Sequence, residues 1–365
     1  MIWTIWNQLC RCRVTRKLDN SNLVLQAFIR QILPLMSRLV HRLLRIDPRE
    51  TQLERRGFIC SKPGVKERLQ HVGSTFLDGY HAALQEGAQE KLAHRLEQIE
   101  TGYRGFAFEG AAMALTLLDG LSPWNKERFS RFAAGPGKQH VYMLHVGAGW
   151  ALARLPWLRF RIESAMRRFH PVLRWLVLDG YGFHEGFFHW QTDLQPKIER
   201  LSQDARHVFH QGLGRSLWFV NGADARLIAQ TIATFAPQFH GDAWSGIGLA
   251  CAYAGGMNRP ELEELRWRAA SHGPALAQGA AFAAKARALA GIPAGHTELA
   301  CTALCGISTE AASGLCDETL RQLDVLHTCP YQQWRALLQQ TLPLHGVLDR
   351  PPAWVAQLDL NHRAF

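Results

Sequence analysis

The chain has 365 residues, a formal net charge of +10, 47% apolar residues and 20% charged residues. This apolar content excludes a chain that is disordered throughout, because it is sufficient to form a core. The length fits one large domain, or one domain preceded by an arm. No run of about 18 consecutive apolar residues occurs, so a conventional membrane-spanning helix is not expected.

The positive charge is concentrated near the N-terminus. Residues 1–60 hold 11 basic and 4 acidic side chains, and most of the remaining excess lies at residues 154–174. We therefore predict three regions: a basic amphipathic arm over residues 1–56, a helical-repeat domain over residues 57–340 and a tail over residues 341–365. Because the predicted repeat domain has only a modest charge, nucleic acid is not an expected partner.

Two segments combine apolar spacing of three and four residues with arginines. Residues 21–46 form the first, and Arg30, Arg38, Arg42 and Arg45 interrupt its apolar positions. Residues 157–169 form the second, with Trp157, Phe160, Ile162, Met166 and Phe169 among arginines. Such helices pack on a core or lie on an anionic membrane surface or a partner. Because the N-terminus lacks the pattern of a signal peptide, the expected location is cytoplasmic, including the inner face of the membrane.

A recurring motif of glycine followed by small residues runs through the body of the chain. The glycines are Gly110, Gly147, Gly182, Gly212, Gly246 and Gly279, with steps of 37, 35, 30, 34 and 33 residues. A period of about 34 residues is typical of helical hairpin repeats. Turn signals and a more polar amphipathic segment follow most of the motifs, for example after Asn221-Gly222. The predicted fold is all-α, with about six hairpins that form an open superhelix or a closed α/α toroid.

The third unit differs from the others in its polar content. Two residues after the motif glycine it carries His184, where the other units have Gly or Ala, and His189 follows shortly after. His184 and His189 are candidate ligands of a metal ion or haem, candidate acid/base groups, or structural buried histidines. Their spacing of five residues is not that of the HExxH zinc motif.

Other polar residues recur in register with the motif glycines. Glu109, Gln211, Ser245 and Gln278 each lie one residue before a glycine, and His140 lies seven before Gly147. If the glycine-containing helices line a common lumen, these groups converge there. A buried Glu109 then needs a cation, a metal or a proton. The candidate catalytic residues are His184, His189, Glu109 and His140, and the predicted substrate-binding lining is Tyr181, Phe183, Phe187, Trp150 and Trp244.

Several long segments resemble one family of bacterial proteins. RGFAFEGAAMAL, HVYMLHVGAGWALARLP, LRWLVLDGYGFHEGFFH, QGLGRSLWFV, SGIGLACAYAGG and HGPALAQGAAFAAKARALAG stand in the order found in the UnbL-like family, from about residue 55 to residue 334. That family is associated with enediyne and related polyene natural-product gene cassettes. The resemblance implies an UnbV-like partner, a membrane-embedded UnbU-like partner, and redox tailoring of a polyketide polyene.

Two hypotheses about function follow. In the first, the chain is an enzyme or redox accessory protein that acts on a long apolar polyene, with a metal ion or haem as the cofactor implied by its histidines. In the second, it is a non-catalytic scaffold that holds the polyketide or the membrane partner. Convergence of His184, His189, His140 and Glu109 favours the enzyme, and their dispersal favours the scaffold.

Overall fold

The structure, a computed structural model, describes residues 42–122, 125–155, 157, 161–323 and 329–343. The chain divides into two units, residues 1–45 and residues 46–365. In the first unit the structure describes only residues 42–45, of which 42–44 are helical. Most of the amphipathic helix predicted over residues 21–46, and the tail after residue 343, therefore lie outside the described residues.

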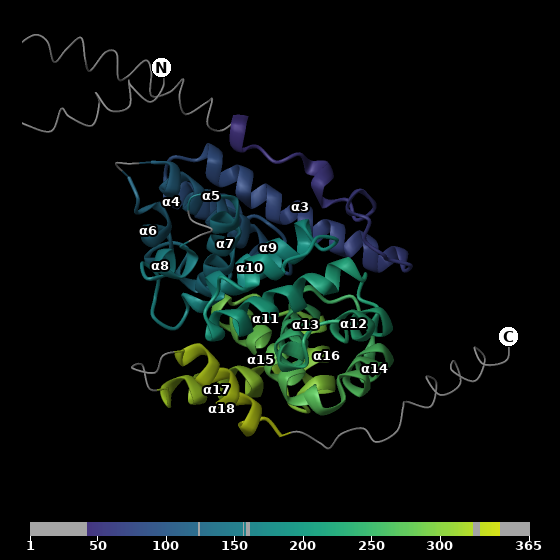
Figure 1. Cartoon of the computed structure of the whole chain (residues 1–365). Coiled ribbons are helices and arrows are strands. Elements are labelled where there is room, and N and C mark those ends of the chain that lie inside the picture. Colours follow the sequence, from purple (N-terminus) through teal and green to yellow (C-terminus); the bar gives the residue numbers. More distant parts are fainter. Residues whose placement is uncertain (1–41, 123–124, 156, 158–160, 324–328, 344–365) are drawn as a thin grey trace, which may run out of the picture. The chain divides into compact units, whose positions relative to one another are not determined.

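The described part of the second unit is helical and contains no strand, which confirms the all-α prediction. Its longer helices pack against one another in chain order, so that the sequence colours of Figure 1 progress across the unit from α3 to α15. These helices are α3 (Pro63–Gln85), α5 (Arg104–Leu121), α7 (Val141–Arg154), α9 (Trp175–Phe188), α11 (Gln203–Val220), α13 (His240–Ala254) and α15 (Gly273–Ala290).

Shorter helices connect the longer ones. They are α4 (Gln89–Glu97), α6 (Arg128–Ala134), α8 (Ile162–Met166), α10 (Gln195–Ile198), α12 (Ala225–Ile232), α14 (Arg259–Ala269) and α16 (Gly295–Leu304). Asp224 caps α12, and Asn258 and Glu261 form a capping box at the start of α14, which explains why helices begin after these turns. Two further helices, α17 (Thr309–Arg321) and α18 (Pro330–Thr341), pack against α15.

Short 3₁₀ helices complete the described elements. They are η1 (Pro48–Thr51), η2 (Glu54–Arg56), η3 (Lys138–His140), η4 (Pro237–Phe239) and η5 (Ala270–His272). The sequence places residues 46–56 in the arm, whereas η1 packs on α3 and Leu53 is buried within the second unit. Burial of Ile46 and Leu53 gives this segment a hydrophobic reason to join the second unit.

Glycines bring the backbones of neighbouring long helices together. A Cβ atom on Gly147 would overlap the carbonyl group of Glu109 on the preceding long helix, and Gly212 stands in the same relation to Asp179. The same contact joins Gly180 to Val146, Gly246 to Gln211, and Gly279 to Ser245. Only a residue without a side chain permits this spacing, which outweighs the low helix propensity of glycine.

These contacts correct the register of the third unit. In α9, Gly180 faces the Val146 carbonyl and thus occupies the place of the first motif glycine, which the sequence analysis assigned to Gly182. Gly182 faces the Phe209 carbonyl on the following long helix. In the neighbouring helices, the second small residue likewise faces a carbonyl of the following long helix. His184 therefore lies four residues after the first glycine, where the other units carry Ala or Ser: Ala114, Ala151, Ser216, Ala250 and Ala283. The steps around this unit become 33 and 32 residues.

The second arginine-rich amphipathic segment uses its apolar side chains within the protein. Ile162, Met166 and Phe169 are buried, and the Phe169 ring contacts that of Phe129 at 4.9 Å between centroids. Trp157 is 54% exposed, and Phe160 lies outside the described residues. The described apolar residues of this segment therefore fit packing on the core, the first of the two alternatives, and not contact with a membrane surface or a partner.

Among the described residues, no single helix combines the length and hydropathy needed to cross a membrane. The bent pair α16 and α17, whose axes differ by 70°, passes that test only when both helices are taken together. Both helices pack on α15, as core helices of a folded domain do.

We predict that Gly212→Ala destabilises the protein by about 1–3 kcal/mol or more, because the new methyl group forces α9 and α11 apart. Gly314→Ala is the matched control, since Gly314 is exposed in α17 and a Cβ atom there meets nothing within 4 Å. The control should raise stability by about 0.5–1 kcal/mol. Urea unfolding of both variants measures these changes in stability. Equal effects of the two substitutions would contradict the close approach of α9 and α11.

Candidate functional site

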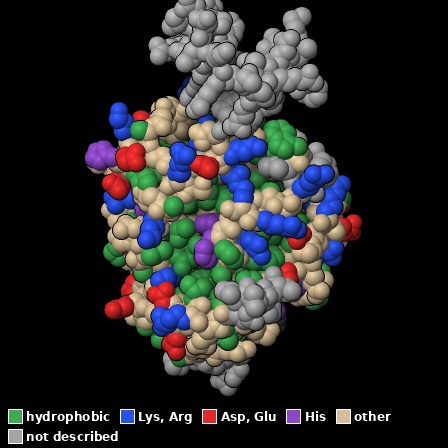
Figure 2. Space-filling view, turned by 90° about the vertical axis from the view of Figure 1, so that its left-hand side faces the viewer, with side chains coloured by type: hydrophobic (Ala, Val, Ile, Leu, Met, Phe, Trp, Pro, Cys, Tyr) green, Lys and Arg blue, Asp and Glu red, His purple; other side chains and the backbone are tan. Residues whose placement is uncertain are grey.

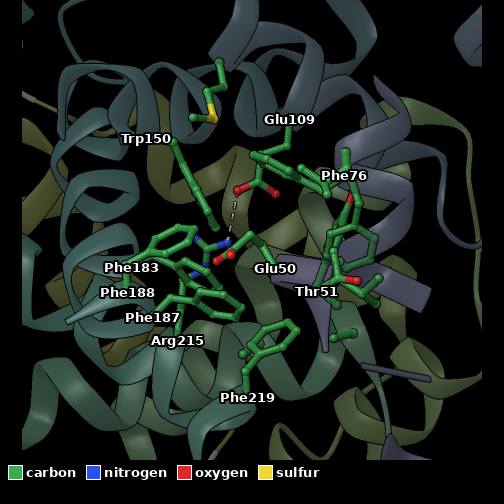
Figure 3. Close-up of a pocket in the computed structure, with 18 of the residues that line it drawn as sticks. Glu50, Thr51, Phe76, Glu109, Trp150, Phe183, Phe187, Phe188, Arg215 and Phe219 are labelled. Atoms are coloured by element: carbon green, nitrogen blue, oxygen red, sulfur yellow. Dashed lines mark ion pairs between the residues drawn. The ribbon is translucent and has the colours of Figure 1, made fainter. Parts of the chain in front are cut away.

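An apolar cavity lies among the long helices of the second unit, with walls from η1, α3, α5, α7, α9, α11 and α13 (Figure 3). It comprises about 770 Å³ of space between atoms, its open mouth included. Five residues of the lining are partly exposed: Glu50, Thr51, Gly73 and Phe188, which mark the mouth, and Leu249 on α13. Aromatic side chains dominate the wall: Phe76, Phe106, Trp150, Phe183, Phe187, Phe188, Phe219 and Tyr253.

The aromatic rings form a continuous wall, with Trp150 at its centre. The Trp150 ring lies 4.6 Å from Phe76 and 5.0 Å from Phe183, measured between centroids. Phe183 in turn stacks on Phe187 at 5.8 Å, with 14° between the ring planes. Trp150, Phe183 and Phe187 are three of the five predicted lining residues. A wall of aromatic faces suits a flat, apolar, conjugated molecule.

The other two predicted lining residues lie elsewhere in the core. Tyr181 is buried and packs against Phe209 at 5.3 Å between ring centroids. Trp244 is buried in α13, and neither residue is part of the cavity wall. Both fill the space between helices.

Glu109 brings a carboxyl group onto the wall of the cavity (Figure 3). The residue is 3% exposed, and its Oε1 lies 3.9 Å from Nη2 of Arg215. Burial raises the pKa of Glu109 to about 7, and Asp179 raises it further, whereas Arg215 and Trp150 oppose this shift. Glu109 therefore exchanges its proton near neutral pH, in the range where a carboxyl group serves as a general acid or base.

Arg215 is held by two carboxylates. Its guanidinium forms an ion pair with Asp179 and lies above the Phe183 ring at 5.0 Å. Burial opposes the charge on Arg215, but Asp179 and Glu109 outweigh that effect, so the pKa of Arg215 is raised. Arg215 thus stays charged and stabilises Glu109 when that residue loses its proton.

Asp179 links the cavity to a buried polar network that crosses five helices, α9, α11, α13, α15 and α18. Gln211 donates from Nε2 to Asp179 at 2.7 Å and to the Tyr331 hydroxyl at 2.8 Å. The Ser245 hydroxyl donates to Oε1 of Gln278 at 2.9 Å, and its oxygen lies 3.4 Å from Oε1 of Gln211. The Glu109, Gln211, Ser245 and Gln278 side chains, predicted from their register, thus join one buried network, Glu109 through Arg215.

The network continues toward the partly exposed His207. Arg335 in α18 donates to Gln278 at 3.2 Å and to Asp242 at 2.7 Å. His207 lies 2.6 Å from Asp242, and this hydrogen bond raises the pKa of His207. These contacts account for buried charges that otherwise carry a large free-energy cost.

Three residues of this network, Asp179, Arg215 and Tyr331, were not predicted from the sequence. Asp179 immediately precedes Gly180, so the correct register places it in the same position as Glu109 and Gln211. Arg215 stands three residues after Gly212, at a position that is apolar in the other units. Tyr331 reaches Gln211 from 120 residues further along the chain, a pairing that only the tertiary structure defines.

His184 lies behind the cavity wall. Its ring contacts Trp150 at 5.8 Å and Phe188 at 4.7 Å between centroids, and its Nδ1 lies 3.4 Å from Glu185. Burial lowers the pKa of His184, although Glu185 opposes this shift. The position fits a histidine that supports Trp150 from outside the cavity lining.

His189 is exposed, and its ring centroid lies 6.2 Å from that of His184. Within the described ranges, no group of three or more His, Cys, Asp or Glu side chains is arranged to hold a metal ion. His184 and His189 are therefore not part of such a group.

His140 also lies outside the cavity lining. Its ring stacks on Phe108 at 3.8 Å, and its Nδ1 is buried without a hydrogen-bond partner. Burial lowers the pKa of His140 to about 4, and Arg104 contributes to this shift. Of the four residues predicted to converge, the cavity wall contains Glu109 alone, so the convergence that would favour the enzyme is not observed.

We predict opposite pH dependences for two buried glutamates. The unfolded pKa of Glu109 is about 4.5 and the folded value about 7, so its contribution to stability is lost as pH rises through that window. Glu109→Gln should therefore gain up to about 3 kcal/mol relative to wild type between pH 4.5 and pH 8.

Glu185→Gln is the matched control. Burial disfavours the charged form of Glu185, but the interactions with His184 and Lys197 outweigh burial and lower the pKa of Glu185. The contribution of Glu185 to stability is therefore present above its unfolded pKa and is lost in acid. This variant should be less stable than wild type at neutral pH, with a smaller difference in acid. Urea titrations across pH measure both slopes, and the same sign for both variants would refute the assignment.

Comparison with known proteins gives a family but no described relative. No curated protein and no solved structure matches the chain. A family model described as protein of unknown function, DUF1702, matches residues 35–342, a range that includes the cavity wall and the buried network. The chain therefore belongs to the DUF1702 family of proteins of unknown function.

Proposed function

We propose that this protein binds a long, uncharged, conjugated molecule of polyketide type in its aromatic cavity, and that Glu109 supplies a proton to it. One observation carries this proposal: a carboxyl group with a pKa of about 7 stands on the wall of an otherwise aromatic cavity. Such a pairing of an apolar pocket with one perturbed acid is typical of ligand and catalytic sites.

The charges around the cavity favour an uncharged ligand. Arg215 forms an ion pair with Asp179, so this cation is already neutralised within the protein. At the mouth, Glu50 binds Arg55 at 2.8 Å and also pairs with Arg56. A charged ligand would lose its hydration here and find no free counter-ion, which makes its transfer into the cavity unfavourable.

The chemistry of the proposed step is proton transfer. Neutral Glu109 donates its proton to a carbonyl oxygen or to a conjugated carbon of the ligand, and the electron pair of the broken O–H bond stays on the carboxylate. Arg215, 3.9 Å away, stabilises that carboxylate until it takes a proton back from another carbon of the protonated ligand, which leaves the ligand neutral with its double bonds shifted. A group with a pKa near the working pH is suited to both halves of this cycle.

The family resemblance supplies the biological setting. We infer that the protein acts in enediyne-type or polyene natural-product biosynthesis, beside UnbV-like and membrane-embedded UnbU-like partners. The groups on the cavity wall move protons, so we assign the electron transfer of any redox tailoring to the partner proteins. The basic arm, which lies mostly outside the described residues, is the proposed contact with a membrane partner or an anionic membrane surface.

We also infer that the long helices derive from one repeated unit. The recurring glycine-to-carbonyl contacts and the alternation of long and short helices support a common origin. According to this inference, the polar residue before the first glycine occupies an equivalent, inward-facing position in each unit. Glu109 is the one of these residues that lines the cavity.

Two linear probes test the proposed binding: a polyene hydrocarbon that fluoresces in apolar surroundings, and a polyene aldehyde of similar length. Wild type should bind both. Ala250→Phe should weaken binding of both about tenfold, because Ala250 lines the cavity. Ala288→Phe adds the same ring at an exposed site on α15 and should leave binding unchanged.

The pH dependence of binding tests the role of Glu109. Wild type should bind the aldehyde about tenfold more tightly at pH 6 than at pH 8, because only neutral Glu109 donates a hydrogen bond. Glu109→Gln should lose this dependence, and hydrocarbon binding should depend less on pH. Binding of both probes with no pH difference would refute the proton-donor role and support the non-catalytic scaffold. The absence of probe binding would refute the proposed function.

A further inference from the structure

A second cavity, of about 440 Å³, lies behind the first. Its walls come from α7, α9, α11, α13, α15 and α18. Three residues, Arg215, Leu249 and Tyr253, line both cavities and form the partition between them. The partition therefore consists of side chains from only two helices, α11 and α13.

The partition contains two buried polar atoms without a hydrogen-bond partner, the Arg215 Nε and the Tyr253 hydroxyl. Arg215 is 5% exposed and Tyr253 is 3% exposed. Unsatisfied polar groups at such depth are uncommon in folded proteins and call for an explanation. Their place between two cavities is consistent with a ligand that carries a hydrogen-bonding group past this point.

Two of the three partition residues, Tyr253 and Arg215, are held in place by other side chains, and Leu249 is less constrained. The Arg287 guanidinium lies 4.3 Å from the Tyr253 ring and donates to the Tyr253 carbonyl at 2.6 Å, which fixes that residue. Asp179 holds Arg215. Leu249 has neither a charge nor a hydrogen bond on its side chain, so rotation about its side-chain bonds is the least costly way to join the cavities.

The second cavity repeats the chemistry of the first. The rings of Phe282 and Trp334 lie 4.4 Å apart, and Tyr331 and Tyr142 complete an aromatic lining. Its one ammonium group, on Lys285, is paired with Asp317 at 2.6 Å. Like the first cavity, it offers aromatic faces and no free charge.

We propose that the second cavity holds the distal part of the same ligand, so that the ligand is an elongated chain that passes between Arg215, Leu249 and Tyr253. This inference rests on the proposed function and names the shape of its substrate. A compact molecule occupies the first cavity alone. A long conjugated chain occupies both cavities, with one end in the first cavity near Glu109 and the other end beside Phe282.

Two diphenylpolyenes that differ only in length test this inference, with diphenylbutadiene as the short probe and diphenyloctatetraene as the long one. Ala286→Phe fills the second cavity, which Ala286 lines. This variant should weaken binding of the long probe about tenfold and leave the short probe unchanged. Ala250→Phe, in the first cavity, should weaken both.

Phe282→Ala provides a second test if Ala286→Phe fails to fold, because it enlarges the same cavity. It should strengthen binding of the long probe and leave the short probe unchanged. Equal effects of either second-cavity variant on both probes would overturn the two-cavity inference while the proposed function stands. Failure of wild type to bind either probe would refute the proposed function instead.

Discussion

The backbones of neighbouring long helices approach so closely that one added methyl group would overlap a carbonyl of the next helix. Gly147, Gly180, Gly212, Gly246 and Gly279 all sit at such contacts. Close packing of this kind gains many dispersion contacts between backbones and leaves little volume for side chains at the crossing. Large side chains are therefore displaced to either side, where the aromatic residues form the two cavities.

The same spacing explains why the interior contains a polar network. The residue before each first glycine lies at a helix contact, and in most of these helices it is polar and buried. Such groups require partners, which they find in one another and in Arg215 and Arg335. Glu109 has the longest of these links, at 3.9 Å, and it borders a space that excludes charge. It is thus the carboxyl group of the network whose pKa is raised, to about 7.

Local pattern was sufficient for much of the fold. Helix content, the glycine-rich helices and the amphipathic segments that became α6, α12 and α14 all depend on neighbouring residues. The register of α9 was two residues wrong, because three glycines stand close together there and only the Val146 contact identifies Gly180 as the first.

The candidate site was only partly predictable for a similar reason. Glu109, Trp150, Phe183 and Phe187 line the cavity as predicted candidates. His184 and His189 attracted attention as rare polar residues, but one is enclosed by aromatic rings and the other is exposed. Arg215 and Tyr331 acquire their roles through contacts between distant segments, which spacing along the chain does not reveal.

Asp179 connects backbone packing to proton affinity. Its carbonyl group faces Gly212 across the contact between α9 and α11, and its side chain forms an ion pair with Arg215 on that same helix. A small change in the separation of these two helices would alter how strongly Arg215 is shared between Asp179 and Glu109. The pKa of Glu109 therefore depends on the spacing of the α9 and α11 backbones at Gly212.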